Sequence, residues 1–485
     1  MNKSAILCVA GGLIATPALA QSFADEFKSQ VIDGTTVTGH ARLYDYRRWH
    51  GDNEPYPNED PNNSHNSRGT ALGGDLIIKS GSMNGFSGGL SVYTQHSLID
   101  YAIQNPALDP QGNVSQLAEA YLRHQSSFTQ ITAGRQLMNT PFANSDMYTM
   151  LTRSFRGISG AFDFGTASIV GKKSDKKAMN DPFSFSVLAP FEYDAQSGQP
   201  DIKLYIARMN RYENRHSNHF TEENRYSAGI NEVDPTVPIN TPGLFTAGLQ
   251  YTPGFGAGDV LARLWVYNFF DYANLQFFET GYQSQKIIGG AKPYIRFQYT
   301  HQSQSGASFA GNVDATYYGA KLGVRFANAD IALIVENAPK HDGSFRNGGL
   351  LHPYSDLSGV FYDDTLTNGL ENLGPGRAFG LHLEYTPSKT LTLTTKYVHY
   401  LAYYGANGSL YAYHGPALFS AKGLDNGRLL PYQSSYAWDV GGTFQLSAIA
   451  ASLKGFSVSD DLGIRGGFGG LKTFIVNRFR LVYSF

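Results

Sequence analysis

Hydrophobic and polar residues alternate with a period of two over many short segments of this chain, which predicts β-strands. Within residues 474–485, Leu481 and Tyr483 share one parity, whereas Arg478 and Arg480 take the other. A core strand of a soluble β-sandwich could show the same alternation. An exposed aromatic edge would invite aggregation in water, however, while a membrane barrel needs apolar side chains toward lipid and polar ones toward its lumen. The pattern therefore favours a membrane barrel.

About eighteen segments carry such a pattern, and each has about the length that a tilted membrane strand requires. Short connections such as 81–85 and 388–389 alternate with long ones such as 137–152 and 174–243. Outer-membrane barrels combine short periplasmic turns with long extracellular loops. We therefore expect an all-β fold, a transmembrane antiparallel barrel of about 18 strands with both termini on the periplasmic side. The expected strands are 36–47, 70–80, 86–94, 116–126, 128–136, 153–164, 167–173, 244–252, 259–270, 273–284, 291–302, 314–327, 330–337, 378–387, 390–401, 436–447, 456–466 and 474–485.

Residues 1–20 have the features of a secretory signal peptide, with a charged start at Lys3, an apolar run and a small-x-small ending at Ala18 and Ala20. Cleavage after Ala20 would leave residues 21–485 as a single barrel domain with lumen-constricting loops. The only cysteine, Cys8, lies within the signal, so the mature chain would carry no thiol, as suits an oxidising compartment. A lipoprotein interpretation of Cys8 would cut the apolar run in half.

Composition supports the same architecture. The chain holds 53 glycines, 31 tyrosines and 31 phenylalanines, and only 16% of its residues are charged. Aromatic girdles and tight turns of a barrel would produce this usage. No run of 18 or more apolar residues follows the signal, which argues against a helical membrane bundle. The formal net charge of −2 shows no basic excess, so we expect no nucleic-acid partner.

Catalytic and cofactor motifs are missing from the sequence. It contains no HExxH, nucleophile elbow, P-loop or dinucleotide fingerprint. His50 with nearby acids, and His216 with His219, could suggest metal sites, but interleaved prolines and asparagines fit solvated loops better. We therefore expect no enzyme activity, no cofactor and no metal.

Basic side chains on the polar parity of the strands are the candidate functional residues. A row of cations along a low-dielectric wall would draw anions inward. Alternatively, each cation pairs with a lumen carboxylate such as Asp75, Glu119 or Glu384 and braces the barrel. Arg263 shares parity with Leu261 and Trp265, so alternation does not place it. The wall residues assigned by parity are Arg42, Arg123, Arg296, Lys321, Arg325, Arg478 and Arg480.

Residues 134–157 resemble a stretch of the OprD family of substrate-specific outer-membrane porins. Members of that family tend to carry a Gly-Arg-Gln strand end, a Thr-Pro step, and then an Asp before a Phe-x-Gly that opens the next strand. Segments 67–76 and 85–93 continue the likeness, and 477–485 is similar too, although most outer-membrane barrels share its pattern. The matching positions are Gly134, Arg135, Gln136, Thr140, Pro141, Asp146, Phe155 and Gly157.

The resemblance implies an 18-stranded barrel in the bacterial outer membrane, a lumen narrowed by inward-folded loops, and a ladder of basic residues that guides small carboxylates. It adds Arg135, Arg153 and Arg156 to the substrate-binding candidates, although Arg135 shares the parity of Ile131 and Ala133. Thr149 and Thr152 stand where the family often has an arginine and a proline, which leaves the substrate open.

The expected function is passive diffusion of small hydrophilic solutes, among them amino acids or other small carboxylates. The alternative is a barrel that acts through its surface loops, as an adhesin or receptor. Expected partners are outer-membrane lipid and lipopolysaccharide, and the barrel assembly machinery through the C-terminal strand. The resemblance is compatible with a monomer or a loose trimer.

Overall fold

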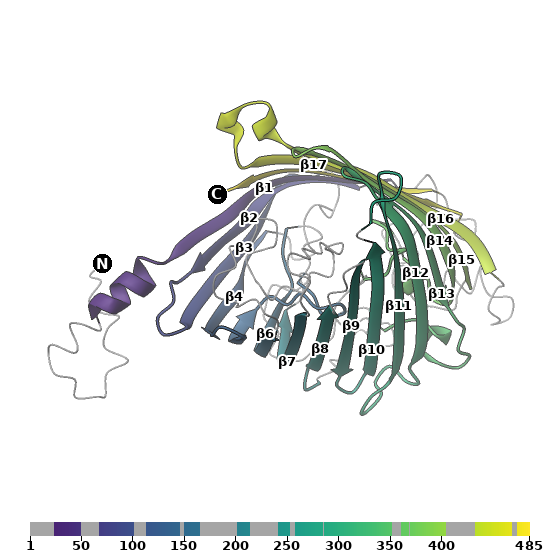
Figure 1. The fold of residues 1–485 in the computed structure, drawn as a ribbon, viewed down its shortest axis with the longest axis horizontal. Helices are drawn as coiled ribbons and strands as arrows, with labels where there is room; N and C mark the ends of the chain where they lie inside the picture. The colour runs from purple at the N-terminus through teal and green to yellow at the C-terminus, as the bar shows by residue number, and fades with distance from the viewer. Residues whose placement is uncertain are drawn as a thin grey trace.

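The chain folds into a closed barrel of 18 antiparallel strands in a computed structural model (Figure 1). Each strand pairs with its neighbours along the chain, and β1 (Thr36–Trp49) closes the ring on β18 (Phe474–Ser484). The expected fold class and strand number are confirmed. The described residues are 24–49, 67–100, 113–145, 150–164, 201–213, 241–252, 258–284, 286–351, 360–367, 369–403, 432–467 and 473–485. The signal peptide expected over 1–20 and most of the loop histidines and acids lie outside them.

Strand positions agree with the sequence pattern nearly everywhere, with ends that differ by a few residues. β8, β10 and β17 have the expected bounds. The strands between β1 and β18 are β2 (Ser67–Lys79), β3 (Phe86–Asp100), β4 (Val114–Gln125), β5 (Thr129–Gln136), β6 (Ser154–Asp163), β7 (Asp201–Glu213), β8 (Leu244–Thr252), β9 (Gly258–Phe269), β10 (Ala273–Ser284), β11 (Lys292–Gln304), β12 (Asp314–Arg325), β13 (Ala329–Ala338), β14 (Gly376–Ser388), β15 (Leu391–Tyr403), β16 (Tyr432–Gln445) and β17 (Phe456–Gly466).

The seventh strand is a correction. The sequence pattern placed a strand at 167–173, which lies outside the described residues, and assigned 174–243 to one loop. The structure instead has β7 at Asp201–Glu213, paired with β6 and β8. The prolines around this segment favoured a loop, although Ile202, Leu204 and Ile206 alternate with polar and small residues as a membrane strand requires. The supposed single loop is therefore two connections at opposite ends of the barrel.

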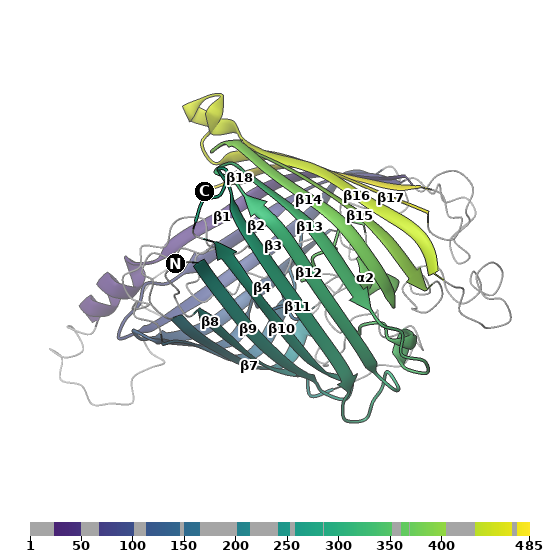
Figure 2. The same cartoon turned by 45° about the vertical axis from the view of Figure 1, so that its right-hand side comes forward.

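Side-chain alternation separates an apolar outer face from a buried inner one, as expected. Leu322 of β12 and Leu333 of β13 point outward and are 56% and 58% exposed, whereas Tyr317 is buried. Figure 2 shows the tilted strands side by side around this surface. Apolar side chains that would be costly to expose to water are stable against lipid chains, so this outer face suits a membrane. No helix in the described residues is long and apolar enough to cross a membrane.

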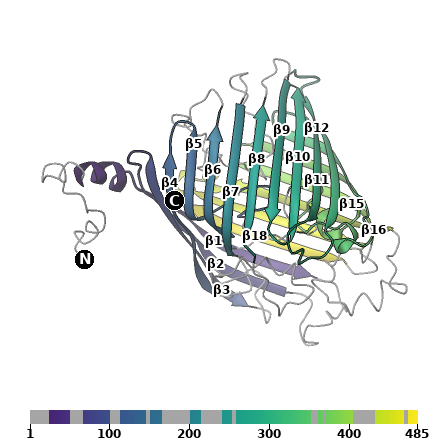
Figure 3. The same ribbon diagram turned by 90° about the horizontal axis from the view of Figure 1, so that it is seen from below.

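The seam between the first and last strands continues beyond β18. The backbone N–H groups of Gly39 and Phe485 each donate to the other residue's carbonyl, at 3.2 and 3.1 Å. A Cβ at Gly39 would lie 2.8 Å from the Phe485 ring, so the absence of a side chain there lets the ring pass. A short π-helix, η2 (Lys28–Ile32), precedes the barrel, and Figure 3 shows this N-terminal segment outside the wall.

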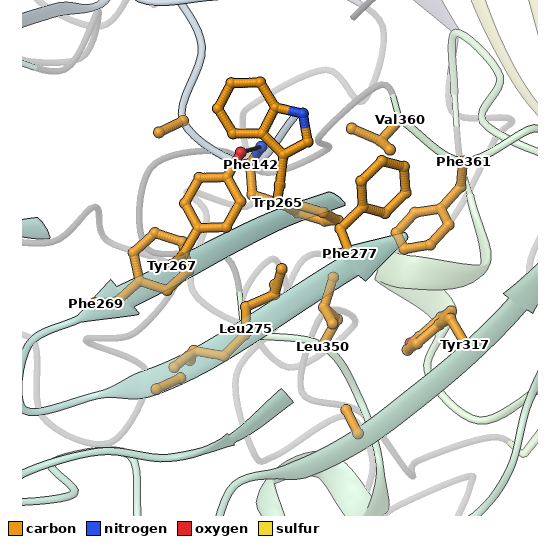
Figure 4. Packing of buried hydrophobic residues seen from close by; sticks show 14 of the residues in the cluster. Phe142, Trp265, Tyr267, Phe269, Leu275, Phe277, Tyr317, Leu350, Val360 and Phe361 are labelled. Carbon is orange, nitrogen blue, oxygen red and sulfur yellow. Dashed lines mark hydrogen bonds between the residues drawn. The ribbon is translucent and has the colours of Figure 1, made fainter. Parts of the chain in front are cut away.

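The largest buried cluster lies inside the barrel. Two connections turn inward from the ends of the strands. One joins β5 to β6 and contributes residues 137–145 and 150–153. The other joins β13 to β14 and carries η3 (Phe345–Asn347) and the short helix α2 (Leu370–Leu373). Their side chains pack with inward residues of the wall, among them Trp265 and Phe277 (Figure 4).

Candidate functional site: the lumen wall and two infolded segments

The two infolded segments meet at an aromatic contact. Phe142 of the first segment and Phe361 of the second lie 5.9 Å apart in an edge-to-face arrangement. Phe142 also packs edge-on against Tyr267 of β9, and its backbone N–H donates to the Tyr267 hydroxyl at 3.2 Å (Figure 4). Phe361 lies 5.1 Å from the ring of Tyr317 on β12. Each segment is therefore fixed to the wall and to the other segment.

The second segment follows the wall through a series of hydrogen bonds. Gln298 of β11 donates to the Val360 carbonyl at 2.8 Å. Tyr362 donates twice, because its hydroxyl donates to Glu279 at 2.8 Å and its N–H donates to Glu336 at 3.0 Å. These bonds are buried, so they give the segment one preferred position.

Two basic residues that the sequence pattern did not single out hold the same segment further along. Lys396 of β15 donates to the carbonyls of Tyr362 and Asp364, at 3.2 and 2.6 Å. Arg465 of β17 donates to the Thr367 carbonyl at 3.3 Å. Both share the inward parity of their strands, and that parity was the only available signal. Nothing in the sequence indicates that a distant connection would cover them.

Two consecutive carboxyl groups of this segment are fully buried. The Asp363 carboxylate accepts from the backbone N–H of Leu370 at 2.7 Å, while the Asp364 carboxylate accepts no hydrogen bond within the described part of the chain. Burial raises the pKa of Asp363 to about 7, and burial with nearby Glu371 raises the pKa of Asp364 well above its usual range. The docked position of the segment therefore favours protonated carboxyl groups.

Arg296, Lys321 and Arg325 form a group that we call the basic cluster. Arg296 on β11 lies directly opposite Lys321 on β12. The Lys321 ammonium lies 3.3 Å from Nδ1 of His382, and Arg325 forms an ion pair with Asp330 at 3.1 Å. Lys321 also lies within electrostatic range of Lys396. Several cations thus share one stretch of the inner wall, and Asp330 and Glu279 are the acids within electrostatic range of them in the described residues.

The candidates on β1 and β18 form ion pairs instead. Arg42 pairs with the buried carboxylate of Asp75, which also accepts from His40 at 2.8 Å. Arg478 and Arg480 share the carboxylate of Asp461. For these three arginines the structure favours the alternative in which ion pairs brace the wall.

The structure also shows where three other arginines lie. Arg123 points inward, donates to the Thr132 hydroxyl at 3.2 Å and stacks over Tyr121. Arg153 is 2% exposed, just before β6. Arg263, which alternation did not place, points inward and pairs with Glu279. Its apolar neighbours on the same parity are buried because the infolded segments cover them.

Two candidates lie on the other side of the wall. Arg156 shares the outer parity of β6 with Ile158, which is 51% exposed, and the prediction of a lumenal Arg156 is wrong. Arg135 is the register partner of Arg156 and takes the outer parity of β5. Its guanidinium donates to the carbonyl of Leu117, another outward residue, at 2.8 Å. Neither position belongs to the inner wall.

In the described residues, no three His, Cys, Asp or Glu side chains gather as possible metal ligands, and His50, His216 and His219 lie outside those residues. The sequence matches no protein-family model and no curated protein.

Solved structures of porins nevertheless share the fold. OpdK of Pseudomonas aeruginosa, crystallised with vanillate, aligns over 93% of this chain and 99% of its own, at 13% identity and a TM-score of 0.64. OccK2 (OpdF) of the same organism, in complex with glucuronate, aligns over 93% and 98%, at 14% identity and a TM-score of 0.62. A BenF-like porin from Pseudomonas fluorescens Pf-5 aligns over 93% and 99%, at 12% identity and a TM-score of 0.65. The chain therefore has the fold of OprD-type porins.

Proposed function

We propose that this chain is a porin of the bacterial outer membrane, through which small hydrophilic solutes diffuse passively. A closed 18-stranded barrel with an apolar outer face and a polar inner wall is built to span that membrane. The structures that it resembles are porins. No bond is made or broken in this function.

The infolded segments would make the narrow part of the passage. Together they contact the inner side of the wall at β9, β12 and β15, through Phe142, Phe361 and Asp364. Solute would cross the lumen space that they leave open, beside the wall residues. Size selection then follows from the docked positions of these segments.

Small carboxylates are the solutes that the inner wall suits best, and the basic cluster is the observation that supports this choice. Lys321 has a second basic group, His382, as its hydrogen-bond partner, and Arg296 lies opposite it. Because the Lys321 ammonium contacts an imidazole rather than a carboxylate, an anion that passes Lys321 and Arg296 would be stabilised. Vanillate and glucuronate, bound in two porins of this fold, are both small carboxylates.

Coulomb's law gives the strength of the attraction between one wall cation and a passing carboxylate. A unit charge about 8 Å from a carboxylate contributes about 2 kcal/mol at an effective dielectric constant of about 20, or roughly thirtyfold in occupancy. Screening by salt, together with the cations that remain, reduces this to about threefold to tenfold.

Lys321→Gln tests the proposal, with Lys321→Arg as the matched variant that keeps the charge. In liposome uptake, we expect glucuronate flux through the Gln variant to fall about threefold to tenfold while neutral sugar flux stays unchanged. The reversal potential in planar bilayers should shift toward cation selectivity, and the shift should shrink in 1 M salt. Equal glucuronate flux in wild type and the Gln variant would show that the basic cluster only braces the wall.

A further inference from the structure

A row of arginines faces outward at the ends of three neighbouring strands, on the side of the long connections. Arg135 of β5, Arg156 of β6 and Arg211 of β7 are consecutive register partners. Arg156 and Arg211 each lie two residues from the end of their strand. Because adjacent strands are about 4.8 Å apart, the guanidinium groups of Arg156 and Arg211 can reach one common ligand, and Arg135 lies on the next strand with its guanidinium at the Leu117 carbonyl.

A backbone irregularity adds a fourth arginine to this surface. One extra residue, Asn210, separates Arg211 from Met209 in the pairing of β7 with β6. Arg208, two residues before Asn210, lies opposite Ile158 and therefore also faces outward. Its guanidinium donates to the Met209 and Leu244 carbonyls and stacks 4.5 Å from the Phe270 ring, so its position is fixed.

Charge compensation is missing at the centre of this row. Within the described part of the chain, neither Arg156 nor Arg211 forms an ion pair or a hydrogen bond through its side chain. Arg135 lies within electrostatic range of Glu213, the last residue of β7. Like charges directly opposite one another in a sheet destabilise it. An anion bound beside the row would relieve this repulsion.

Another pair of outward arginines, on β1 and β2, offers a contrast. Arg47 of β1 and Arg68 of β2 are also outward register partners, and Arg47 lies two residues from its strand end. There, however, the Asp45 carboxylate pairs with both arginines, at 2.7 and 3.4 Å. Within the described residues, a carboxylate pairs with both arginines of the Arg47–Arg68 pair, and none pairs with Arg156 or Arg211.

We infer that the row formed by Arg135, Arg156, Arg208 and Arg211 is a binding site for the phosphate groups of lipopolysaccharide in the outer leaflet. The row lies at the level where the long connections leave the membrane, which is where lipid headgroups lie. Next to it, Ile158 and Phe245 are exposed and apolar, so an acyl chain can lie beside the charged group. Guanidinium groups form paired hydrogen bonds with phosphate oxygens, which suits this ligand. The inference does not depend on what passes through the lumen.

The test is a titration of the folded full chain in detergent, with the bound lipid counted by native mass spectrometry. The probes are bis-phosphorylated lipid A, dephosphorylated lipid A, phosphatidylglycerol and inorganic phosphate. The variant is Arg156→Gln with Arg211→Gln, and the matched control is Arg47→Gln with Arg68→Gln, which removes equal charge from the neutralised pair. For wild type, we expect bis-phosphorylated lipid A to bind about tenfold more tightly than each other probe.

The Gln variant should lose about that factor, while the control should change by less than about threefold. Arg156→Lys with Arg211→Lys keeps the charge but not the paired hydrogen bonds, so it should restore only part of the affinity. If the double variant does not fold, Arg156→Gln and Arg211→Gln are measured singly, and each should lose part of the affinity. The inference is wrong if the Gln variants bind like wild type, if the control loses as much, or if dephosphorylated lipid A, phosphatidylglycerol or inorganic phosphate binds equally well. Channel conductance should be equal in all variants, so failure here is distinguishable from failure of the proposed porin function.

Discussion

Phe361 is the side chain whose removal should most directly open the passage. It is almost completely buried, and it joins the second infolded segment both to Phe142 and to Tyr317. Phe361→Ala removes both ring contacts and leaves a cavity between the segment and the wall. Truncation of a buried phenylalanine costs about 3–5 kcal/mol, of which each lost aromatic pair accounts for about 0.5–1.5 kcal/mol.

That cost acts on the docked position of the segment, because the barrel wall itself keeps its strand pairing. A loss of about 3 kcal/mol lowers the ratio of docked to undocked states by a factor of roughly 150. Seven hydrogen bonds between the wall and backbone groups of residues 360–367 would remain. We therefore expect frequent undocking rather than permanent release.

Single-channel recordings in planar bilayers measure this directly. The Phe361→Ala variant should show a higher mean conductance and additional open levels, and larger sugars should pass through it in liposome assays. Phe379→Ala is the matched control, since Phe379 is 45% exposed on the outer face and contacts no infolded segment by parity. If both variants conduct like wild type, the aromatic contact does not hold the passage closed.

Two other predictions concern buried carboxyl groups. The raised pKa values of Asp363 and Asp364 mean that docking is favoured below the pKa and weakened as pH rises through about 7. Conductance in bilayer recordings should therefore be lower at pH 5 than at pH 8.5. Asp364→Asn should reduce this difference. An unchanged pH dependence in the variant would contradict the role of the Asp364 carboxyl group in docking. Asp75→Ala should lower the free energy of unfolding in urea by about 3–5 kcal/mol, because it leaves the Arg42 guanidinium buried without its carboxylate. Arg42→Met together with Asp75→Ala should recover most of that loss, and equal stability of the single and double variants would show that the unpaired charge is not the cause.

Alternation alone was enough to predict the barrel and the direction of most wall residues. It works because lipid and lumen impose opposite demands on consecutive side chains, as at Leu322 and Lys321. The pattern failed where the inner wall is not solvated. Leu261 and Trp265 point inward with Arg263 because infolded segments cover them, and contacts between distant parts of the chain leave no periodic signal.

The candidate site was only partly predictable for related reasons. Arg156 lies near a strand end, where lipid gives way to headgroups and the outer parity tolerates charge. Whether Arg42 binds a solute or braces the wall depends on the register that places Asp75 within reach of it, since Asp75 is opposite His40 rather than Arg42. Lys396 could be placed on the inner wall from parity, but its role in holding residues 362–364 required the position of a connection far away in sequence.

The seam between β1 and β18 has a consequence for the order of assembly. Every other strand pair joins neighbours in sequence and can form as soon as its hairpin exists, whereas this pair joins the first and last strands of the sheet. The sheet must therefore persist as an open curved ribbon, with β1 unpaired on one edge, until β18 arrives. During that interval its free edges are able to pair with other strands. An assembly factor that binds the edge where β18 will form would protect the ribbon, and it would bring β18 to its pairing position beside Gly39 of β1.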